Sequence, residues 1–512
     1  MTTASSAGAP PPRSIWFETS DPIRTDDALP SAADVVVVGA GLTGIATALM
    51  LARRGRRAVV VEARTIGAAT TGHTTGKLSL LQGDVLSELR SRSGEAAMRA
   101  YVAGNRAAQD WVVLEAGDDR DIMQQTTSYT YSTTPEGDEL IASEADALAA
   151  AGLTAHRTQA GAMERLGLPF PVTSGLAMDN QWQLHSLRLL GRLVARLREA
   201  GGTVVEGCRV TGANLVENGV HVETDRGVIR SAALVIATGT PILDRGLFFA
   251  KLAPLRSLVG AYALDPEAAL PRGVYLSVDP RARSLRTAVD KAGRRVLLVG
   301  SQSFTTGRED STTELLAELD AWTAENFGPS RRVTWWGAQD YRSLNRLPYA
   351  GELPRGGGRI YVATGYNKWG MTNAIASALT ISGAIAGETP TWAQELDAAR
   401  PVLKAGGEAV TVNAEVAGEL VAGWARAETG SSARKAAPEE GEGHVGHAGV
   451  QPVAVATVDG VTCRVSGVCT HLGGVLSWND AERSWDCPLH GSRFDVEGRV
   501  LEGPAVKDLT RL

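Results

Sequence analysis

Two short motifs near the C-terminus could hold a metal centre, because each places one cysteine close to one histidine: Cys469-Thr470-His471 and Cys487-Pro488-Leu489-His490. Two thiolates and two neutral imidazoles can bind a single zinc ion. They can also bind a 2Fe–2S cluster, with the thiolates on one iron and the imidazoles on the other. The single residue between Cys469 and His471, the Gly491-Ser492 pair and Phe494 favour the cluster.

The stretch from 469 to 509 closely resembles the Rieske 2Fe–2S domain. The resemblance implies a small all-β domain whose cluster ligands are Cys469, His471, Cys487 and His490. Rieske domains fused to FAD oxidoreductases often carry two further cysteines that can form a disulfide, and Gly474 and Leu489 occupy these places here. We therefore expect no such disulfide, which suits a reducing compartment and argues against a high-potential cluster of the respiratory type.

A glycine-rich turn near the N-terminus could bind nucleotide phosphates. The β-branched run 34–38 predicts a buried strand, and the helical pattern after the turn continues to about Arg54. In the turn, Gly39 permits the tight bend, Gly41 lets the backbone approach a pyrophosphate, and Gly44 lets the helix pack on the strand. Glu62 ends the next strand, where its carboxylate can bind ribose hydroxyls. The pattern predicts a nucleotide site; a glycine-rich turn in an α/β core is the alternative.

Two later segments indicate FAD. Residues 234–239 predict a strand that ends in an Ala-Thr-Gly turn, as in flavoproteins that bind two dinucleotides. Residues 364–372 resemble the last FAD-contacting loop of the D-amino-acid oxidase and glycine oxidase superfamily, and residues 345–351 precede it at the family's spacing, with Asn345 where Asp is commoner. The resemblance spans roughly residues 34–400. It implies an FAD domain built from separated segments and a substrate domain with an antiparallel sheet.

The resemblance also implies which residues contact FAD. His73 stands where relatives of dimethylglycine dehydrogenase carry a flavin-linked histidine, so a covalent and a noncovalent role are both open. Because the chain has one full dinucleotide fingerprint, we expect electrons to come from a substrate and not from NAD(P)H. The expected contacts are Gly39, Gly41, Leu42, Thr43, Gly44, Glu62, Ala63, Arg64, Thr71, His73, Thr74, Gly76, Lys77, Val210, Ala237, Thr238, Gly239, Gly365, Trp369, Gly370, Met371 and Thr372.

Relatives in this superfamily oxidise a C–N bond: a hydride passes from the α-carbon to flavin N5 and leaves an imine that hydrolyses. The expected substrate is therefore a small amine or amino acid. Asp340 stands where amino-acid oxidases often place an arginine that binds the substrate carboxylate, so it could instead meet a cationic amine; an ordinary hydrogen-bonded polar residue is the equal alternative. Arg256, Arg342 and Arg346 are candidate replacements for that arginine, with a surface position or packing between domains as the favoured alternative for each. The residues that we expect in catalysis are Lys368, Asp340, Tyr366 and Arg256.

The electron acceptor follows from the same comparison. Several oxidase relatives carry a lysine that assists reaction with O2, and its strand reads Val296-Leu297-Leu298-Val299 here, although Lys368 could approach from another loop. A cluster in the same chain favours a dehydrogenase that passes electrons singly to the cluster and then to an external one-electron acceptor. An oxidase that uses O2 beside a structural Rieske domain, and an electron relay without its own substrate, are the alternatives. A Rieske oxygenase is disfavoured, because we find no further His/His/carboxylate group in the sequence.

The predicted fold is an α/β, Rossmann-type FAD domain with an α+β antiparallel-sheet substrate domain and a small all-β Rieske domain. We expect a disordered tail over 1–30, the FAD oxidoreductase over 31–400, a helix and linker over 401–447, and the Rieske domain over 448–512. Within the oxidoreductase, the FAD-binding segments are expected at about 31–110, 176–250 and 345–400, and the substrate-domain segments at about 111–175 and 251–344.

Composition excludes little but is consistent with this assignment. The 512 residues include 51 basic and 57 acidic side chains, for a net charge of −6, which gives no reason to expect nucleic acid or an anionic membrane as partner. The nearly apolar run 32–52 has the length of a membrane span, but its glycines and the following Arg53-Arg54 favour a buried strand and helix. Residues 1–13 lack the apolar core of a secretory signal, and four cysteines do not make a disulfide scaffold. We therefore expect a cytoplasmic protein.

Overall fold

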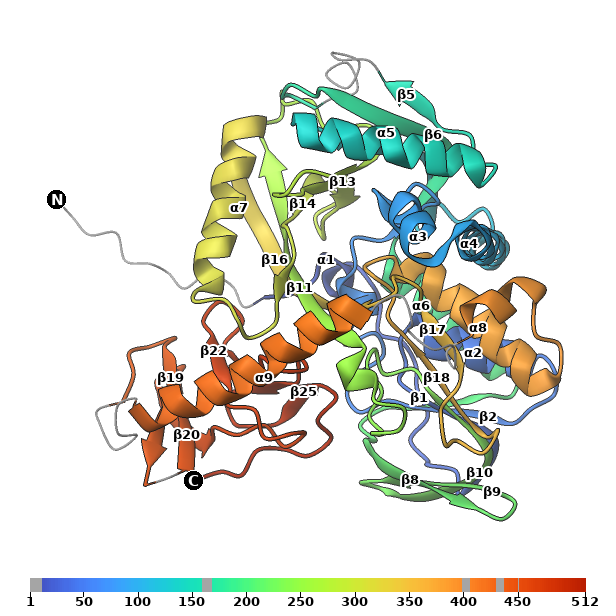
Figure 1. Cartoon of the computed structure of the whole chain (residues 1–512), viewed down its shortest axis with the longest axis vertical. Helices are drawn as coiled ribbons and strands as arrows, with labels where there is room; N and C mark the ends of the chain where they lie inside the picture. The colour runs from blue at the N-terminus through green and yellow to red at the C-terminus, as the bar shows by residue number, and fades with distance from the viewer. Residues whose placement is uncertain (1–11, 159–167, 398–405, 430–436, 450) are drawn as a thin grey trace.

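Two large sheets and a small β domain make up the chain in the computed structural model, which describes residues 12–158, 168–397, 406–429, 437–449 and 451–512 (Figure 1). The C-terminal domain lies against one end of the larger sheet, and helix α9 (Gly406–Thr429) runs beside the junction. Within the described part of the chain, no helix combines the length and apolar character needed to cross a membrane.

The first sheet is the predicted nucleotide-binding sheet. Its order is β17-β18-β10-β1-β2-β7, with β8 and β9 added beside β10. Valines fill β1 and β2 because both faces of a parallel sheet are covered. The strands are β1 (Ala32–Val38), β2 (Ala58–Val61), β7 (Thr203–Val205), β8 (Val210–Val216), β9 (Gly219–Thr224), β10 (Gly227–Ile236), β17 (Tyr349–Glu352) and β18 (Ile360–Thr364).

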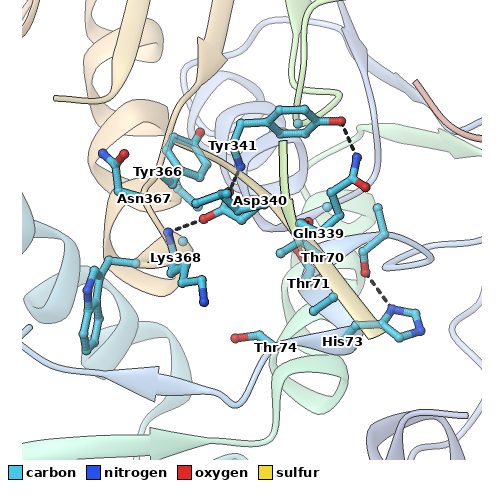
Figure 2. Close-up of a pocket in the computed structure, with 18 of the residues that line it drawn as sticks. Thr70, Thr71, His73, Thr74, Gln339, Asp340, Tyr341, Tyr366, Asn367 and Lys368 are labelled. Atoms are coloured by element: carbon cyan, nitrogen blue, oxygen red, sulfur yellow. Dashed lines mark hydrogen bonds between the residues drawn. The ribbon is translucent and has the colours of Figure 1, made fainter. Parts of the chain in front are cut away.

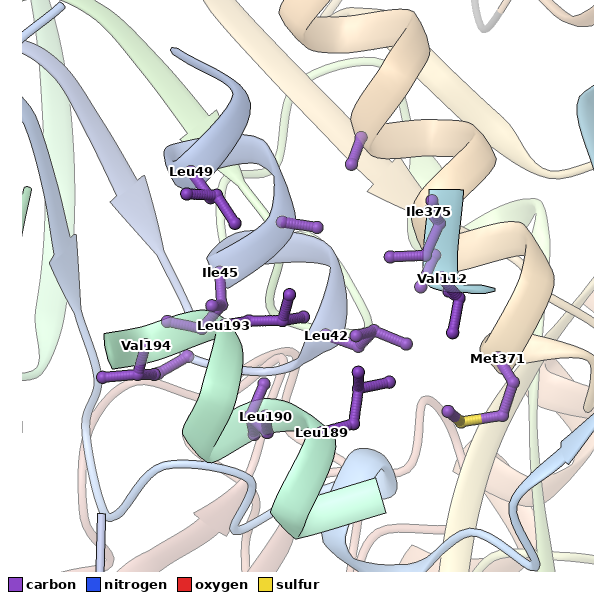
Figure 3. Close-up of a cluster of buried hydrophobic side chains, with 14 of the residues drawn as sticks. Leu42, Ile45, Leu49, Val112, Leu189, Leu190, Leu193, Val194, Met371 and Ile375 are labelled. Atoms are coloured by element: carbon purple, nitrogen blue, oxygen red, sulfur yellow. The ribbon is translucent and has the colours of Figure 1, made fainter. Parts of the chain in front are cut away.

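Four helices bury the apolar side of this sheet: α2 (Leu42–Ala52), α4 (Glu95–Ala116), α6 (Ser186–Glu199) and α8 (Gly370–Ala386). Every residue of α2 is buried, and Figure 3 shows its leucine and isoleucine side chains between those of α6 and α8. The apolar run 32–52 is thus the strand β1 followed by the buried helix α2, as the sequence predicted. This packing fixes the N-terminus of α2 beside the ends of β1 and β10.

The second sheet forms the other wall of the functional site. Its order is β15-β11-β14-β13-β12-β4-β6-β3, with β16 paired to β11 and β5 to β6, and its pairs are antiparallel except β4 with β12. Helices α3 (Val85–Ser93), α5 (Pro135–Ala150) and α7 (Thr312–Phe327) pack around it. The strands are β3 (Lys77–Leu78), β4 (Met123–Ser132), β5 (His156–Thr158), β6 (Ser174–Leu184), β11 (Leu252–Leu264), β12 (Val274–Ser277), β13 (Ser284–Val289), β14 (Arg295–Gly300), β15 (Phe304–Thr305) and β16 (Ser330–Ser343).

The C-terminal domain consists of two small antiparallel sheets around a core that includes Trp485 and Phe494. One sheet has the order β19-β20-β21 and the other β22-β23-β24-β25. The strands are β19 (Gly443–Ala448), β20 (Gln451–Val458), β21 (Val461–Ser466), β22 (Ser477–Asn479), β23 (Ser484–Asp486), β24 (Arg493–Asp495) and β25 (Val500–Glu502).

Three expected boundaries differ from the structure. In the tail expected over 1–30, residues 1–11 lie outside the described part, but Ile15 and Trp16 in the short helix α1 (Ile15–Glu18) are buried against the core. Residues 176–184, expected in the FAD domain, belong to β6 of the second sheet because they pair with β4. Residues 443–447, expected as linker, form β19 by pairing with β20.

Candidate FAD cavity and iron–sulfur site

The glycine-rich turn has the backbone geometry that a pyrophosphate site requires. Gly39 has φ +101°, and a Cβ there would lie 2.5 Å from the carbonyl oxygen of Ala237. A Cβ on Gly44 would lie 1.9 Å from the carbonyl oxygen of Gly39. Side chains are therefore excluded at both positions, and the N-terminus of α2 lines the cavity, where its amides favour an anion.

Glu62 lies at the end of β2, beside this turn. Its carboxylate accepts hydrogen bonds from the backbone amides of Ala40 and Arg64, each at 2.9 Å. These bonds fix the carboxylate at the cavity wall, where its remaining lone pairs can accept hydrogen bonds from ribose hydroxyls. The turn and the acid therefore fit the adenosine and pyrophosphate of FAD.

One large cavity, with a volume of about 660 Å³, joins this nucleotide site to the second sheet. Its lining comes from segments far apart in the sequence, as the resemblance implied. Most of the expected cofactor residues line it; Gly44, Gly76, Gly365 and Thr372 do not, and act behind the lining through backbone geometry or hydrogen bonds. The lining residues from the expected set are Gly39, Gly41, Leu42, Thr43, Glu62, Ala63, Arg64, Thr71, His73, Thr74, Lys77, Val210, Ala237, Thr238, Gly239, Trp369, Gly370 and Met371.

The loop that carries His73 is held from behind by two tryptophans. It begins with the short helix η1 (Thr70–His73). The indole of Trp16 donates to the carbonyl of Thr74 at 2.6 Å, and that of Trp336 donates to the carbonyl of His73 at 2.7 Å. The N-terminal segment therefore has a definite role: it braces the loop expected beside the flavin.

The imidazole of His73 is at the cavity edge, opposite Lys368 in Figure 2. Its Nδ1 is 2.8 Å from the carbonyl oxygen of Ala69, and the ring packs against Phe17 at 5.5 Å between centroids. Burial lowers the pKa of His73, with a smaller opposing effect from the bond to Ala69. A covalent link to the flavin stays a prediction.

Two lysines line the end of the cavity that the second sheet forms. The ammonium group of Lys77 contacts the hydroxyl of Ser284, and that of Lys368 lies 2.7 Å from the hydroxyl of Ser257. Burial lowers the pKa of Lys77 to about 7, and the charge of Lys368 adds to this effect. Burial also lowers the pKa of Lys368 to about 8, against the opposing charge of Asp340. The two amino groups at this end of the cavity can bind an anion, whose charge would in turn favour the protonated form of both lysines.

Asp340 and Tyr366 line the cavity but are held by protein groups (Figure 2). The Asp340 carboxylate accepts hydrogen bonds from the backbone amides of Tyr341, at 2.8 Å, and Lys368. Burial raises the pKa of Asp340, while these bonds oppose the rise. The hydroxyl of Tyr366 is 2.8 Å from that of Thr43. Both side chains thus hold the 366–369 loop and the start of α2 in place, and their part in catalysis stays a prediction.

Of the two roles considered for Arg256, substrate ligand and packing between domains, its surroundings fit the second. Its side chain is buried and points into the junction between domains, where it pairs with Glu482 at 2.5 Å and lies 3.6 Å from Glu502. Arg493 bridges the same two carboxylates and also pairs with Asp486 at 2.9 Å. Among the described residues, Arg256 therefore belongs to an interdomain ion-pair network and not to the lining of the cavity.

The four expected cluster ligands come together at the tip of the C-terminal domain. Cys469 and Cys487 are buried in the same core cluster, and the imidazole rings of His471 and His490 have centroids 5.2 Å apart. Among the described residues, no three His, Cys, Asp or Glu side chains meet at one point as a single-ion site needs. Paired thiols beside paired imidazoles fit the two irons of a 2Fe–2S cluster instead.

No described cysteine is in a disulfide, and the two positions noted in the sequence pack against each other. A Cβ on Gly474 would lie 2.6 Å from the Leu489 side chain and 3.1 Å from the Cys487 sulfur. Leu489 thus fills the space in front of Gly474. An apolar contact closes the ligand loops here.

The imidazole side of the cluster site faces the FAD domain. Nε2 of His471 is 3.1 Å from the carboxylate of Asp244, and the ring of Phe249, in η3 (Phe248–Ala250), packs against His490 with centroids 5.3 Å apart. The side chain of His471 is only 7% exposed. The C-terminal domain also supplies part of the FAD cavity wall: Leu501, Glu502, Gly503, Ala505 and Val506.

Sequence reasoning missed the residues that act across the domain junction. Gln339 lines the cavity and bonds to the C-terminal domain, and Ser257 and Ser284 hold the two lysines. The segment 501–506 was expected only as part of the Rieske fold. Nothing in their types or spacing marks these residues, because their roles arise from contacts made over long separations.

Comparisons with known proteins agree with this geometry. The model of the FAD dependent oxidoreductase family (DAO) matches residues 34–383, and that of the Rieske [2Fe-2S] domain matches residues 433–512. A putative Rieske 2Fe-2S iron-sulfur protein of Bacillus subtilis, YhfW, is 30% identical over 98% of this chain and 97% of its own length. The cytochrome b6-f complex iron-sulfur subunit 1 of a Nostoc species is 53% identical over 45 residues, which are 9% of this chain and 25% of the subunit.

Solved structures share the fold of the FAD-binding part. Glycine oxidase from Geobacillus kaustophilus matches with a TM-score of 0.60 and 19% identity, over 73% of this chain and 100% of its own. L-Proline dehydrogenase from P. horikoshii matches with a TM-score of 0.59 and 16% identity, over 72% of this chain and 98% of its own. The fold class, cofactors and enzyme class predicted from the sequence are confirmed. The chain belongs to the DAO family of FAD-dependent oxidoreductases, carries a Rieske domain at its C-terminus, and has FAD and a 2Fe–2S cluster as its cofactors.

Proposed function

We propose that this enzyme oxidises the C–N bond of a small amino acid and passes the electrons one at a time to its own Rieske cluster. An external one-electron acceptor would then take them from the cluster. The proposal rests on one observation: the FAD fingerprint and the 501–506 segment of the Rieske domain line the same cavity. The cluster ligands are docked at the same junction.

FAD would supply the hydride acceptor, and the cluster would supply a carrier of single electrons. The residues of the chain bind the cofactor and orient the substrate. The helix α2 and Glu62 hold the nucleotide, and the loop braced by Trp16 and Trp336 bounds the cavity. Positioning of this kind accounts for much of the rate in reactions that need little acid–base chemistry.

Lys77 and Lys368 favour an amino acid over a plain amine. In the described structure neither ammonium group has a carboxylate within ion-pair distance; each contacts a serine hydroxyl instead. Lys77 is buried, and a buried cation without a counter-charge is costly, so a substrate carboxylate that pairs with Lys77, or with both lysines, would be stabilised. The two lysines would then take the role of the arginine found in other amino-acid oxidases.

The docking of the Rieske domain also favours a dehydrogenase over an oxidase with a structural cluster. Asp244 and Phe249 cover the imidazole side of the cluster site, and the ion pairs around Arg256 hold the domain in this position. A domain with a purely structural role would not need its ligand loops to face the FAD domain.

An anaerobic titration tests the proposal. The holoenzyme is mixed with a panel of D- and L-amino acids, N-methyl amino acids and matching decarboxylated amines, and the flavin and cluster absorption bands are followed. We expect an amino acid to bleach the flavin and then reduce the cluster, and its decarboxylated analogue to bind much more weakly. The proposal is wrong if no amino acid reduces the flavin while chemical reduction of both centres succeeds. A Cys469→Ser variant provides the control, because its flavin should still be reduced without a cluster signal.

A further inference from the structure

One buried side chain crosses the wall between the FAD cavity and the Rieske domain. Gln339, on β16, is 2% exposed and lines the cavity. Its Nε2 donates to the carbonyl oxygen of Gly491 and to the hydroxyl oxygen of Tyr341, each at 2.8 Å. Gly491 directly follows His490, a cluster ligand, so the amide of Gln339 is one hydrogen bond and one residue away from the cluster.

The orientation of this amide is fixed. The hydroxyl of Thr306 donates to Oε1 of Gln339 at 2.8 Å. Because the carbonyl oxygen of Gly491 can only accept, the amide nitrogen must face it, and Oε1 is left to accept from the Thr306 hydroxyl. Thr306 is fully buried, so water does not compete for this bond.

The two domains are in close contact at this point. Gly491 has φ +77°, and a Cβ there would lie 2.5 Å from the side chain of Pro254 and 2.9 Å from Nε2 of Gln339. Any side chain at position 491 would therefore push the Rieske domain away from β11 and β16. The close contact depends on glycine at 491 and on a long amide at 339.

On the other side, Gln339 contacts the loop beside the flavin site. The backbone carbonyl oxygen of Gln339 accepts a hydrogen bond from the hydroxyl of Thr70 at 2.5 Å. Thr70 lies in η1, next to Thr71 and His73, which line the cavity (Figure 2). A chain of bonded and hydrogen-bonded atoms thus runs from the flavin loop through Gln339 to Gly491 and His490.

We infer that Gln339 is the bridge through which electrons pass from the flavin to the cluster. The inference rests on the proposed function and adds its route. In each transfer, one electron leaves the reduced flavin and one enters the oxidised cluster, with no bond made or broken at Gln339. Tunnelling falls steeply with distance and is stronger through bonds and hydrogen bonds than across gaps, so loss of this contact slows the transfer while both centres remain in place.

The test uses full-length holoenzyme and a Gln339→Met variant, which keeps the side-chain length but cannot donate. Gln109→Met is the matched control, because Gln109 is also buried and donates to Leu78 and Gln181, away from the cavity lining. Flash-photoreduced 5-deazariboflavin, with EDTA as electron donor, reduces the flavin anaerobically, and the cluster band is followed afterwards. Redox titrations of both centres separate a change of route from a change of driving force.

We expect Gln339→Met to slow cluster reduction by about tenfold or more, equivalent to ~1.4 kcal/mol of added barrier, with unchanged potentials and cofactor content. Gln109→Met should behave as wild type. Thr306→Val, a milder change that frees the amide to rotate, should give an intermediate rate and decides the matter if Gln339→Met fails to fold. Transfer within about twofold of wild type in both interface variants would overturn the inference alone. Absence of transfer in the wild type would overturn the proposed function as well.

Discussion

Removing the charge of Glu482 should loosen the Rieske domain from the FAD domain. Glu482 is 8% exposed and pairs with Arg256, itself 2% exposed. Burial disfavours its ionised form, but the charges of Arg256 and Arg493 outweigh burial and lower its pKa to about 2. Relative to the ordinary value of 4.5, this difference corresponds to roughly 3 kcal/mol. We expect Glu482→Gln to reduce the free energy of unfolding by about 3 kcal/mol at pH 7, in line with other broken buried pairs.

The sign of the pH dependence follows from the lowered pKa. The ionised carboxylate stabilises the folded state fully above about pH 4.5, and this contribution is lost as the pH falls toward 2. The difference between wild type and Glu482→Gln should therefore be largest near neutral pH and shrink below about pH 4.5. At low pH the wild type loses the stabilisation by the ionised Glu482 carboxylate, which the substitution removes at every pH.

Urea unfolding, followed by the visible circular dichroism of the cluster at several pH values, measures this effect. Glu415→Gln is the matched control, because Glu415 also joins the two parts of the chain, through Arg308 at 3.2 Å, but is 56% exposed. Its loss should cost less than about 1 kcal/mol. If Glu482→Gln costs no more than this control, the buried pair does not form in solution, and Arg256 would again be a candidate substrate ligand.

Three further outcomes are expected. Lys77→Met should stabilise the FAD-free protein by up to about 4 kcal/mol at pH 7, because the folded pKa of about 7 lies below the ordinary 10.5; thermal unfolding should show this gain shrinking as the pH rises toward 10.5. Trp16→Ala removes a buried ring and the bond to Thr74, so it should cost roughly 3–5 kcal/mol and speed FAD release, measured by flavin fluorescence after dilution; unchanged release would show that α1 does not brace the loop. Cys469→Ser should abolish the visible 2Fe–2S bands and keep FAD, whereas Cys463→Ser, on β21 outside the cluster site, should keep both.

Both cofactor sites were predictable because their chemistry is local in sequence. Gly39 and Gly44 are required by one turn, and the cluster ligands come in pairs within three residues of each other. Such spacing has few physical explanations, so a single sequence is enough to predict the two cofactor sites. The strand before the turn and the helix after it then follow from hydrophobic patterning.

Roles that depend on a distant partner were not predictable. Arg256 was a candidate substrate ligand because an arginine near a flavin can bind a carboxylate. Packing between domains was the favoured alternative, but the sequence does not identify the partner, Glu482, which lies 226 residues away in another domain. Gln339 carries no signal of its own, since its role comes from Gly491 across the junction. The three apolar residues 15–17 did indicate that this part of the N-terminus is buried, but they directly follow a Pro- and Ala-rich stretch that is typical of a disordered tail.

The Leu489–Gly474 contact has a consequence for how such sequences can change. A cysteine placed alone at position 474 would meet the leucine, and a cysteine alone at 489 would leave a cavity above the glycine. Each single step is therefore unfavourable, although the double replacement could yield a disulfide in the same space. Apolar and disulfide-closed Rieske loops are thus two separate solutions joined by a costly intermediate. A chain that has reached the apolar solution keeps its ligand loops closed regardless of the thiol chemistry around it.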